Sequence, residues 1–115
     1  MSDGLDAADT LMIPPSLAEA VSRLVGMLHP ERIYLFGSRA RGDAEADSDY
    51  DLMVLVPESN DSAYRRARDA YTALLDVAIP MDILVWTRDE FNTQLPADAS
   101  LPATILREGR VLYAA

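Results

Sequence analysis

The chain has 115 residues, of which 50% are hydrophobic and 25% charged, a length and composition typical of one globular domain rather than of a disordered or fibrous protein. Nineteen acidic residues against ten basic ones give a formal charge of -9, so no nucleic-acid partner is expected, because such a surface repels polyanions. The basic residues are all arginine and there is no cysteine, which excludes a P-loop lysine, Schiff-base chemistry, disulfides and thiolate catalysis.

The first segment, residues 1–12, is polar and shows no apolar period, so we expect a flexible N-terminal tail followed by a single domain over residues 13–115. It carries acid where a secretory signal needs positive charge, and no apolar run in the chain approaches the length of a membrane span. We therefore expect a cytoplasmic protein with no membrane partner.

The first predicted helix ends before Pro30. Ser16 and Glu19 have the spacing of a capping box at its start, and His29 is expected to be a C-terminal cap rather than a catalyst. The apolar residues that follow the box at helical spacing are Leu17, Val21, Leu24, Val25 and Leu28. This stripe is expected to face a core.

Two short strands are predicted next, over residues 33–36 and 50–56, because both are apolar runs bounded by glycine, charged residues or proline. The segment between them, residues 37–48, is rich in glycine, arginine and aspartate and lacks either period. We expect a loop there, with room for one helical turn.

The following helix is predicted to begin at Asn60, Asp61 or Ser62, which offer capping oxygens, and to end near Val77. One of its sides is expected to carry Tyr64, Ala67, Tyr71, Leu74 and Ala78. Its arginines are expected to form a solvated face, made of Arg65, Arg66 and Arg68.

A strand over residues 81–86, a short helix capped by Thr87, a helix over residues 99–108 and a strand over residues 111–113 complete the predicted order. Gly109 is expected to end the last helix in the left-handed conformation. Tyr34, Trp86 and Phe91 are expected in the core. Three to four strands with helices packed against them predict a small mixed α/β sheet.

Three aspartates stand where strands are predicted, although aspartate is disfavoured in strands. Asp49 and Asp51 are separated by one residue, so their carboxylates project from one face, and Asp82 interrupts the next apolar strand. If the strand of Asp82 pairs beside that of Asp51, the three carboxylates form one cluster. Such a cluster can bind two Mg²⁺ ions, which prefer hard oxygen ligands and shared phosphates.

A second pattern precedes the aspartates. Gly37 and Ser38 follow the first strand directly, where glycine lets a phosphate approach the backbone and the serine can donate to it. Arg39 and Arg41 add charge that could bind a triphosphate. A Gly-Ser turn or an Asp-x-Asp pair is by itself usually structural. The joint pattern at this spacing is the informative feature.

The segments Phe36-Gly-Ser-Arg-Ala-Arg-Gly42 and Ser48-Asp-Tyr-Asp-Leu52 resemble the nucleotidyltransferase superfamily of DNA polymerase β, and more narrowly the minimal nucleotidyltransferase antitoxins. The closing segment, residues 105–113, is also similar to the end of those small proteins. The resemblance implies the DNA polymerase β-like nucleotidyltransferase fold and transfer of AMP from ATP.

Site roles and a partner are also implied by the resemblance. Gly37 and Ser38 would bind the nucleotide phosphates, Asp49 and Asp51 would bind Mg²⁺, and Asp82 would be the third ligand and the base for the acceptor hydroxyl. Family members are similar in pairing with a HEPN-domain ribonuclease toxin, which they neutralise by adenylylating a tyrosine. Hetero-oligomers with the toxin, or homo-oligomers, are compatible with this reading.

Two other functions remain open on the sequence alone. The chain could be a non-catalytic antitoxin that inhibits its partner by occlusion, since little beyond a catalytic unit is present to grip a large acceptor. It could also transfer the nucleotide to a small molecule such as an antibiotic. The acceptor, the nucleotide preference and the number of AMP groups added are not fixed by the residues.

Overall fold

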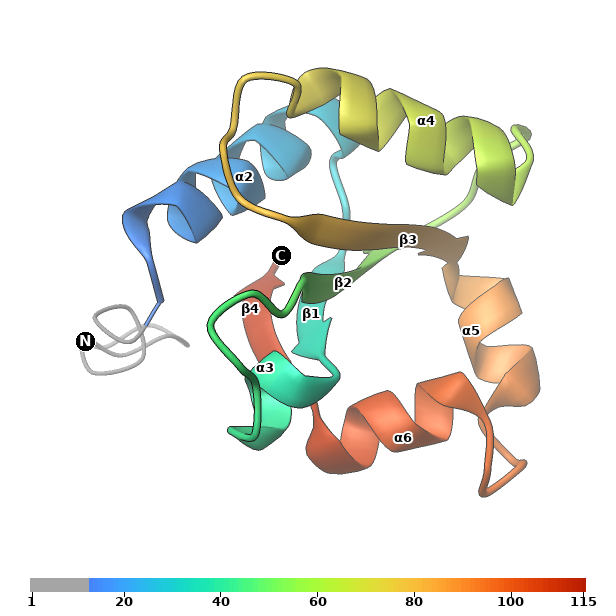
Figure 1. Ribbon diagram of the computed structural model, residues 1–115. Helices are drawn as coiled ribbons and strands as arrows, with labels where there is room; N and C mark the ends of the chain where they lie inside the picture. The colour runs from blue at the N-terminus through green and yellow to red at the C-terminus, as the bar shows by residue number, and fades with distance from the viewer. Residues whose placement is uncertain (1–12) are drawn as a thin grey trace, which may run out of the picture.

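The fold is a four-stranded sheet with helices on both faces (Figure 1). The computed structural model describes residues 13–115, so the predicted flexible tail, residues 1–12, lies outside the described residues. The strands are β1 (Arg32–Phe36), β2 (Tyr50–Val56), β3 (Met81–Thr87) and β4 (Arg110–Ala114), in the order β3-β2-β1-β4. Strands β2 and β3 are parallel and the other pairs antiparallel, which confirms the predicted mixed sheet.

Two helices cover each face of this sheet (Figure 1). Helices α2 (Pro15–Leu28) and α4 (Ala63–Ala73) pack on one face, and α5 (Arg88–Gln94) and α6 (Leu101–Glu108) on the other. The loop after β1 contains one short helix, α3 (Ser38–Arg41), which agrees with the single helical turn expected there. None of the helices within residues 13–115 is long and apolar enough to cross a membrane.

Strand β2 is buried on both faces from Leu52 to Val56, which explains its unbroken apolar run. Leu52, Val54 and Val56 pack with residues of α2 and α4, while Met53 and Leu55 pack with residues of α5 and α6. The predicted core aromatics lie on this second side, where the rings of Tyr34 and Phe91 stack at 6.0 Å and Trp86 packs against the cluster. The two layers fix β2 from Leu52 onward, directly after Asp51.

The ends of α2 confirm one cap and correct another. His29 has φ 50° and ψ 54° and its N–H bonds the Val25 carbonyl, as a left-handed C-terminal cap should. The predicted capping box of Ser16 and Glu19 is wrong, because the helix already begins at Pro15 and no side chain caps it. Proline suits the first helical position, since its φ is fixed and it has no N–H to be satisfied.

Gly109 follows α6 but is extended, with φ -80° and ψ 170°, so the predicted left-handed conformation is wrong. A Cβ atom at this position would lie 2.6 Å from the Ile105 carbonyl oxygen and 3.0 Å from that of Leu35. Glycine is therefore needed because α6 and β1 approach its backbone closely.

Helix α4 begins as predicted after Ser62, whose hydroxyl accepts the Arg65 N–H, but it ends at Ala73 rather than near Val77. Its buried side carries Arg66, Ala70 and Leu74. The side predicted from Tyr64 to Ala78 is wrong, since Tyr64 is 76% exposed. Arg66 is buried instead of solvated because Glu90 of α5 binds its guanidinium. A charged residue on the buried side interrupts the apolar period, so the pattern does not predict this side of the helix.

Candidate active site

Two of the three predicted carboxylates are neighbours on parallel strands. Asp51 of β2 and Asp82 of β3 are directly paired in the register, so their side chains leave the same face of the sheet. Adjacent strands lie about 4.8 Å apart, which brings the two side chains within reach of one small ion. The condition that the third strand pairs beside the second is therefore met.

Asp49 lies directly before β2 and adds a further negative charge that acts on Asp51. Partial burial raises the pKa of Asp51, and the negative charges of Asp82 and Asp49 raise it further, while Arg41 opposes them. Asp49 and Asp82 are exposed and Asp51 is half-buried. The three acids thus repel one another at an open edge of the sheet, where a cation would relieve the repulsion.

Gly37 places the turn after β1 directly against Asp51. Phe36 pairs with Asp51 across the antiparallel strands, and the chain then turns at Gly37 with φ 77° and ψ -158°, a conformation that essentially only glycine adopts. A Cβ at this position would collide with the Asp51 carboxylate. Glycine is therefore required at position 37 for two reasons: its backbone angles and the close approach of the Asp51 carboxylate.

Ser38 begins helix α3 beside that turn. The carbonyl oxygen of Gly37 accepts the N–H groups of Ala40 and Arg41, at 3.0 and 3.1 Å. The N–H groups of Ser38 and Arg39 precede these bonds, so the helix itself does not use them. Their position suits the predicted phosphate contact of Gly37 and Ser38, which stays a prediction.

The two predicted nucleotide-binding arginines have different surroundings. Arg39 donates to the carbonyl oxygens of Ala46 and Ser48, and its guanidinium lies 4.4 Å from the centre of the Tyr50 ring, so it holds the loop before β2. Arg41 pairs with Asp43 at 3.2 Å and also acts on Asp51 through space. Of the two, Arg41 is better placed to turn toward a bound anion without loss of the loop.

The donor chemistry at this edge fits Mg²⁺, although the ligand set is incomplete. Within residues 13–115 no three carboxylate or imidazole groups are close enough to hold an ion alone. Protein sites for Mg²⁺ commonly supply only one or two carboxylates and leave the other positions to water and substrate phosphates. The neighbouring Asp51 and Asp82, with Asp49 nearby, match that type of site.

Tyr71 of α4 is a site residue that the sequence did not reveal. Its hydroxyl oxygen accepts the Ile83 N–H at 2.8 Å and lies 3.4 Å from Asp82 Oδ1. Burial raises the pKa of this phenol, an effect that the Ile83 bond opposes and the Asp82 charge reinforces. Tyr71 is therefore a protonated donor at neutral pH. Only the packing of α4 along β3 brings it there, so no local sequence signal could have found it.

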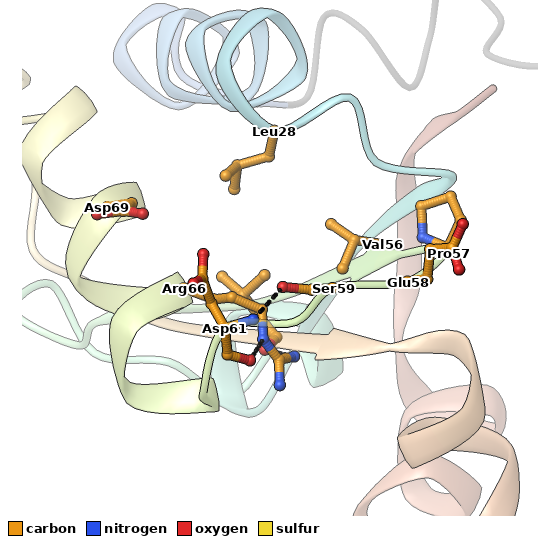
Figure 2. A pocket seen from close by; sticks show the side chains of 9 residues that line it. Leu28, Val56, Pro57, Glu58, Ser59, Asp61, Arg66 and Asp69 are labelled. Atoms are coloured by element: carbon orange, nitrogen blue, oxygen red, sulfur yellow. Dashed lines mark hydrogen bonds between the residues drawn. The ribbon is translucent and has the colours of Figure 1, made fainter.

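A pocket at the opposite end of β2 contains none of the predicted site residues. Figure 2 shows it between Leu28, Val56 and Arg66. Its volume is about 140 Å³. Arg66 lines it but already bonds the Asp61 carbonyl oxygen and the Glu90 carboxylate. Sites for drug-sized ligands usually enclose roughly 300 Å³ or more, so this pocket is small for a nucleotide.

Comparison with known proteins agrees with this geometry. The model of the nucleotidyltransferase domain family matches residues 15–112. A Methanocaldococcus jannaschii protein named "Putative protein adenylyltransferase" is 33% identical over 84 residues, which are 72% of this chain and 78% of that protein.

Two solved structures share the fold. One, described as a "putative nucleotidyltransferase" from Sulfolobus solfataricus, has a TM-score of 0.63 at 19% identity, covering 86% of this chain and 78% of that one. The other, described as a toxin-antitoxin with AMP-PNP, has a TM-score of 0.53 at 24% identity, covering 85% and 73%. By the family match and the sequence relative, the chain belongs to the nucleotidyltransferase domain family and is a nucleotidyltransferase.

Proposed function

We propose that the protein is a Mg²⁺-dependent protein adenylyltransferase, which transfers AMP from ATP to a tyrosine of a HEPN-domain ribonuclease toxin and so acts as its antitoxin. The observation that carries the proposal is the direct pairing of Asp51 and Asp82 on parallel strands, beside the Gly37 turn. Asp49, Asp51 and Asp82 are the residues that would hold the metal. When bound, Mg²⁺ would offset the negative charge of the phosphates and of the leaving pyrophosphate.

The chain's own groups have distinct tasks in this reaction. The backbone at Gly37 and the Ser38 hydroxyl bind the phosphates, and Arg41 adds positive charge beside them. Asp82 accepts the proton of the acceptor hydroxyl, whose oxygen forms a bond to the α-phosphorus of ATP. The bond from that phosphorus to the bridging oxygen breaks, and pyrophosphate leaves. Attacking and leaving oxygens lie in line.

Exposure of the carboxylates supports a protein as the acceptor. Asp82 lies at the surface on β3, the outermost strand, and Asp49 is exposed directly before β2, the second strand, where a large partner can approach. A small-molecule acceptor would need an enclosing pocket. The pocket of Figure 2 lies at the other end of β2 and lacks these residues.

Two similar proteins support the chemistry and the partner. The sequence relative is named a protein adenylyltransferase with the qualifier "putative", and one structure with this fold is a toxin-antitoxin with AMP-PNP, an ATP analogue. The HEPN identity of the partner and the tyrosine target rest on the resemblance of the Gly-Ser and Asp-x-Asp segments to the antitoxin family.

The test starts from the reading frame next to this one, where the proposal expects a small helical HEPN partner, and measures modification of that partner. Mixed with the purified protein and MgATP, the partner is expected to gain the mass of one or more AMP groups. The double variant Asp49→Asn, Asp51→Asn should lose this modification while keeping its fold. Asp98→Asn, an exposed aspartate between α5 and α6, is the matched control and should keep it. Unchanged modification by the double variant would refute the metal assignment.

The alternative function is inhibition by occlusion, in which the carboxylates at the start of β2 and β3 take no part in catalysis. The chain would then inhibit its partner by covering it, without transfer. The same double variant separates the two functions. Neutralisation of the partner's ribonuclease activity that survives Asp49→Asn, Asp51→Asn would establish inhibition by occlusion.

A further inference from the structure

On the outer edge of β3, next to Asp82, a backbone N–H group donates a hydrogen bond to the side chain of Tyr71 in α4. Strand β3 is the outermost strand of the sheet, so every second N–H and carbonyl group on its outer side has no strand partner. The Tyr71 hydroxyl oxygen accepts one of these groups, the Ile83 N–H, at 2.8 Å. The side chain of Tyr71 is thereby fixed against the backbone of the residue that follows Asp82.

This bond sets the direction of the remaining hydroxyl proton. The Ile83 N–H occupies one lone pair of the Tyr71 oxygen, so the O–H points elsewhere. The acceptor within reach is Asp82 Oδ1, at 3.4 Å. The tyrosine thus links one carboxylate oxygen of Asp82 to the backbone of β3 and leaves Oδ2 for other ligands.

The hydrogen bond from Tyr71 matters more for Asp82 than it would for Asp51. Asp82 is exposed and lies near the start of an edge strand, whereas its neighbour Asp51 is half-buried and packs against the Gly37 backbone. A free exposed carboxylate rotates among its rotamers, and holding it in one costs side-chain entropy. Outer hydrogen bonds to ligating carboxylates fix their orientation in metal sites.

We propose that Tyr71 is a positioning residue for Asp82, which orients the carboxylate toward the ion and acceptor site by hydrogen bonding to Oδ1 while anchored on Ile83. The inference rests on the proposed function, since it takes Asp82 as a ligand and base. In this role Tyr71 acts through Asp82 and is not itself a ligand or a base. It holds the Asp82 carboxylate in one orientation beside Asp51.

The test compares Tyr71→Phe with Tyr64→Phe, the same change at an exposed tyrosine of the same helix. Mn²⁺ binding to the purified chain, with a non-hydrolysable ATP analogue present, is followed by electron paramagnetic resonance. Tyr71→Phe is expected to weaken Mn²⁺ binding ~10-fold, the lower end for loss of an outer hydrogen-bonding partner. Tyr64→Phe should bind Mn²⁺ as the wild type does.

A background of Asp82→Asn separates positioning from a general effect on the fold. If Tyr71 acts through Asp82, adding Tyr71→Phe to Asp82→Asn should cause no further loss of Mn²⁺ binding. An equal loss in both backgrounds would overturn the inference, because the hydroxyl would then act through the strand alone. In transfer assays Tyr71→Phe should raise the Mg²⁺ concentration needed for half-maximal rate and leave the KM for the acceptor unchanged.

The remaining outcomes are also decisive. Wild-type protein that binds no Mn²⁺ would overturn the metal assignment of the proposed function together with this inference. Normal Mn²⁺ binding by both wild type and Tyr71→Phe would overturn the inference alone. An added AMP on Tyr71 of the wild-type chain, found by mass spectrometry after incubation with MgATP, would also overturn it, since the hydroxyl would then be an acceptor.

Discussion

Acidic side chains lie at both ends of β3: Asp82 near its start and Glu90, in the first turn of α5, just after its end. An arginine binds the carboxylate directly only at the Glu90 end. At the end of the strand, Arg66 donates to both oxygens of Glu90, at 2.9 and 2.8 Å, and to the Val85 carbonyl oxygen at 2.8 Å. The hydrogen bond from Arg66 is the main reason that the pKa of Glu90 falls to about 2. At the start of the strand Asp82 lies beside Asp51 of β2, whose pKa is raised by burial and by the charges of Asp82 and Asp49.

The opposite pKa shifts of Glu90 and Asp51 distinguish a carboxylate that stabilises the fold from one that is available to bind a ligand. A carboxylate whose pKa is lowered in the folded state stabilises it at neutral pH, whereas one whose pKa is raised costs stability there. Glu90 belongs to the first kind and Asp51 to the second. Costly charges that lie side by side on one face are typical of functional sites. Four substitutions test this division, each at one end of β3.

Gly37→Ala should have the largest effect, at the aspartate end. The Cβ would collide with the Asp51 carboxylate, and alanine does not tolerate φ 77° with ψ -158°. Displacement of Asp51 should lower kcat/KM for AMP transfer by roughly 10³-fold, about 4 kcal/mol. Transfer is measured as AMP incorporated into the acceptor protein.

The matched control is Gly26→Ala in α2. No atom lies within 4 Å of the Cβ that it would add, and the helical backbone suits alanine. We expect unchanged transfer and a gain in stability of up to about 1 kcal/mol. Gly37→Ala with wild-type transfer would show that Asp51 need not stay where the structure has it.

Arg66→Met should have the next largest effect, on stability and at the opposite end. The substitution leaves the Glu90 carboxylate and the Val85 carbonyl without their donor. Breaking such a pair costs several kcal/mol when both groups are buried, and here Glu90 is half-exposed, so we expect a loss of about 3 kcal/mol. Urea unfolding measures it, with Arg68→Met, an exposed arginine of the same helix, as the control. Equal losses in the two variants would contradict a special role for Arg66.

Glu90→Gln should give a smaller loss that depends on pH. The pKa of Glu90 is about 2 in the folded protein against a usual value of 4.5, so its contribution is present above pH 4.5 and is lost as the pH falls toward 2. Because the side chain is 44% exposed, solvent screening reduces the expected loss at pH 7 to about 1 kcal/mol. The stability difference between wild type and variant should shrink below pH 4.5. A difference that stays constant from pH 7 to 3 would contradict the ion pair.

The strands could be predicted closely because each is an apolar run with clear ends. Predicted bounds for the second strand, residues 50–56, match β2. The aspartates were recognisable for the same reason, as charges where apolar residues are expected. Their meeting across β2 and β3 depended on which strands pair, and the residues of each strand alone do not fix that order. In the structure α4, the crossover helix between the two strands, packs on β3, and β3 lies parallel beside β2.

Contacts between distant residues explain what the sequence did not reveal. Arg66 faces inward only because Glu90, 24 residues later, meets it, and a periodic pattern treats every arginine as outward. Tyr71 reaches Asp82 by the same packing of α4 on β3. The place of Arg39 on the Tyr50 ring was likewise not foreseen. The roles assigned to Gly37, Ser38, Arg39, Arg41 and the three aspartates remain predictions.

Asp51→Asn should have the smallest effect on stability and gives the sharpest contrast with Glu90→Gln. A raised folded-state pKa means that the ionised Asp51 costs stability once the pH rises through that pKa, so at pH 7 the cost is present. Asparagine keeps the shape and removes the charge. Without metal the variant should equal the wild type or exceed it by less than about 1 kcal/mol, since part of the side chain is solvated. Urea unfolding at pH 7 measures the difference.

Added Mg²⁺ should make the wild type more stable than Asp51→Asn. A ligand that binds only the folded state stabilises it in proportion to the logarithm of its concentration over the Kd, so added Mg²⁺ should raise the stability of the wild type. Asp51→Asn, which lacks a predicted ligand, should gain little, while Glu90→Gln should gain as much as the wild type. If Asp51→Asn instead lost more than about 1 kcal/mol without metal, Asp51 would be a structural acid like Glu90, and the two ends of β3 would not differ in the way proposed.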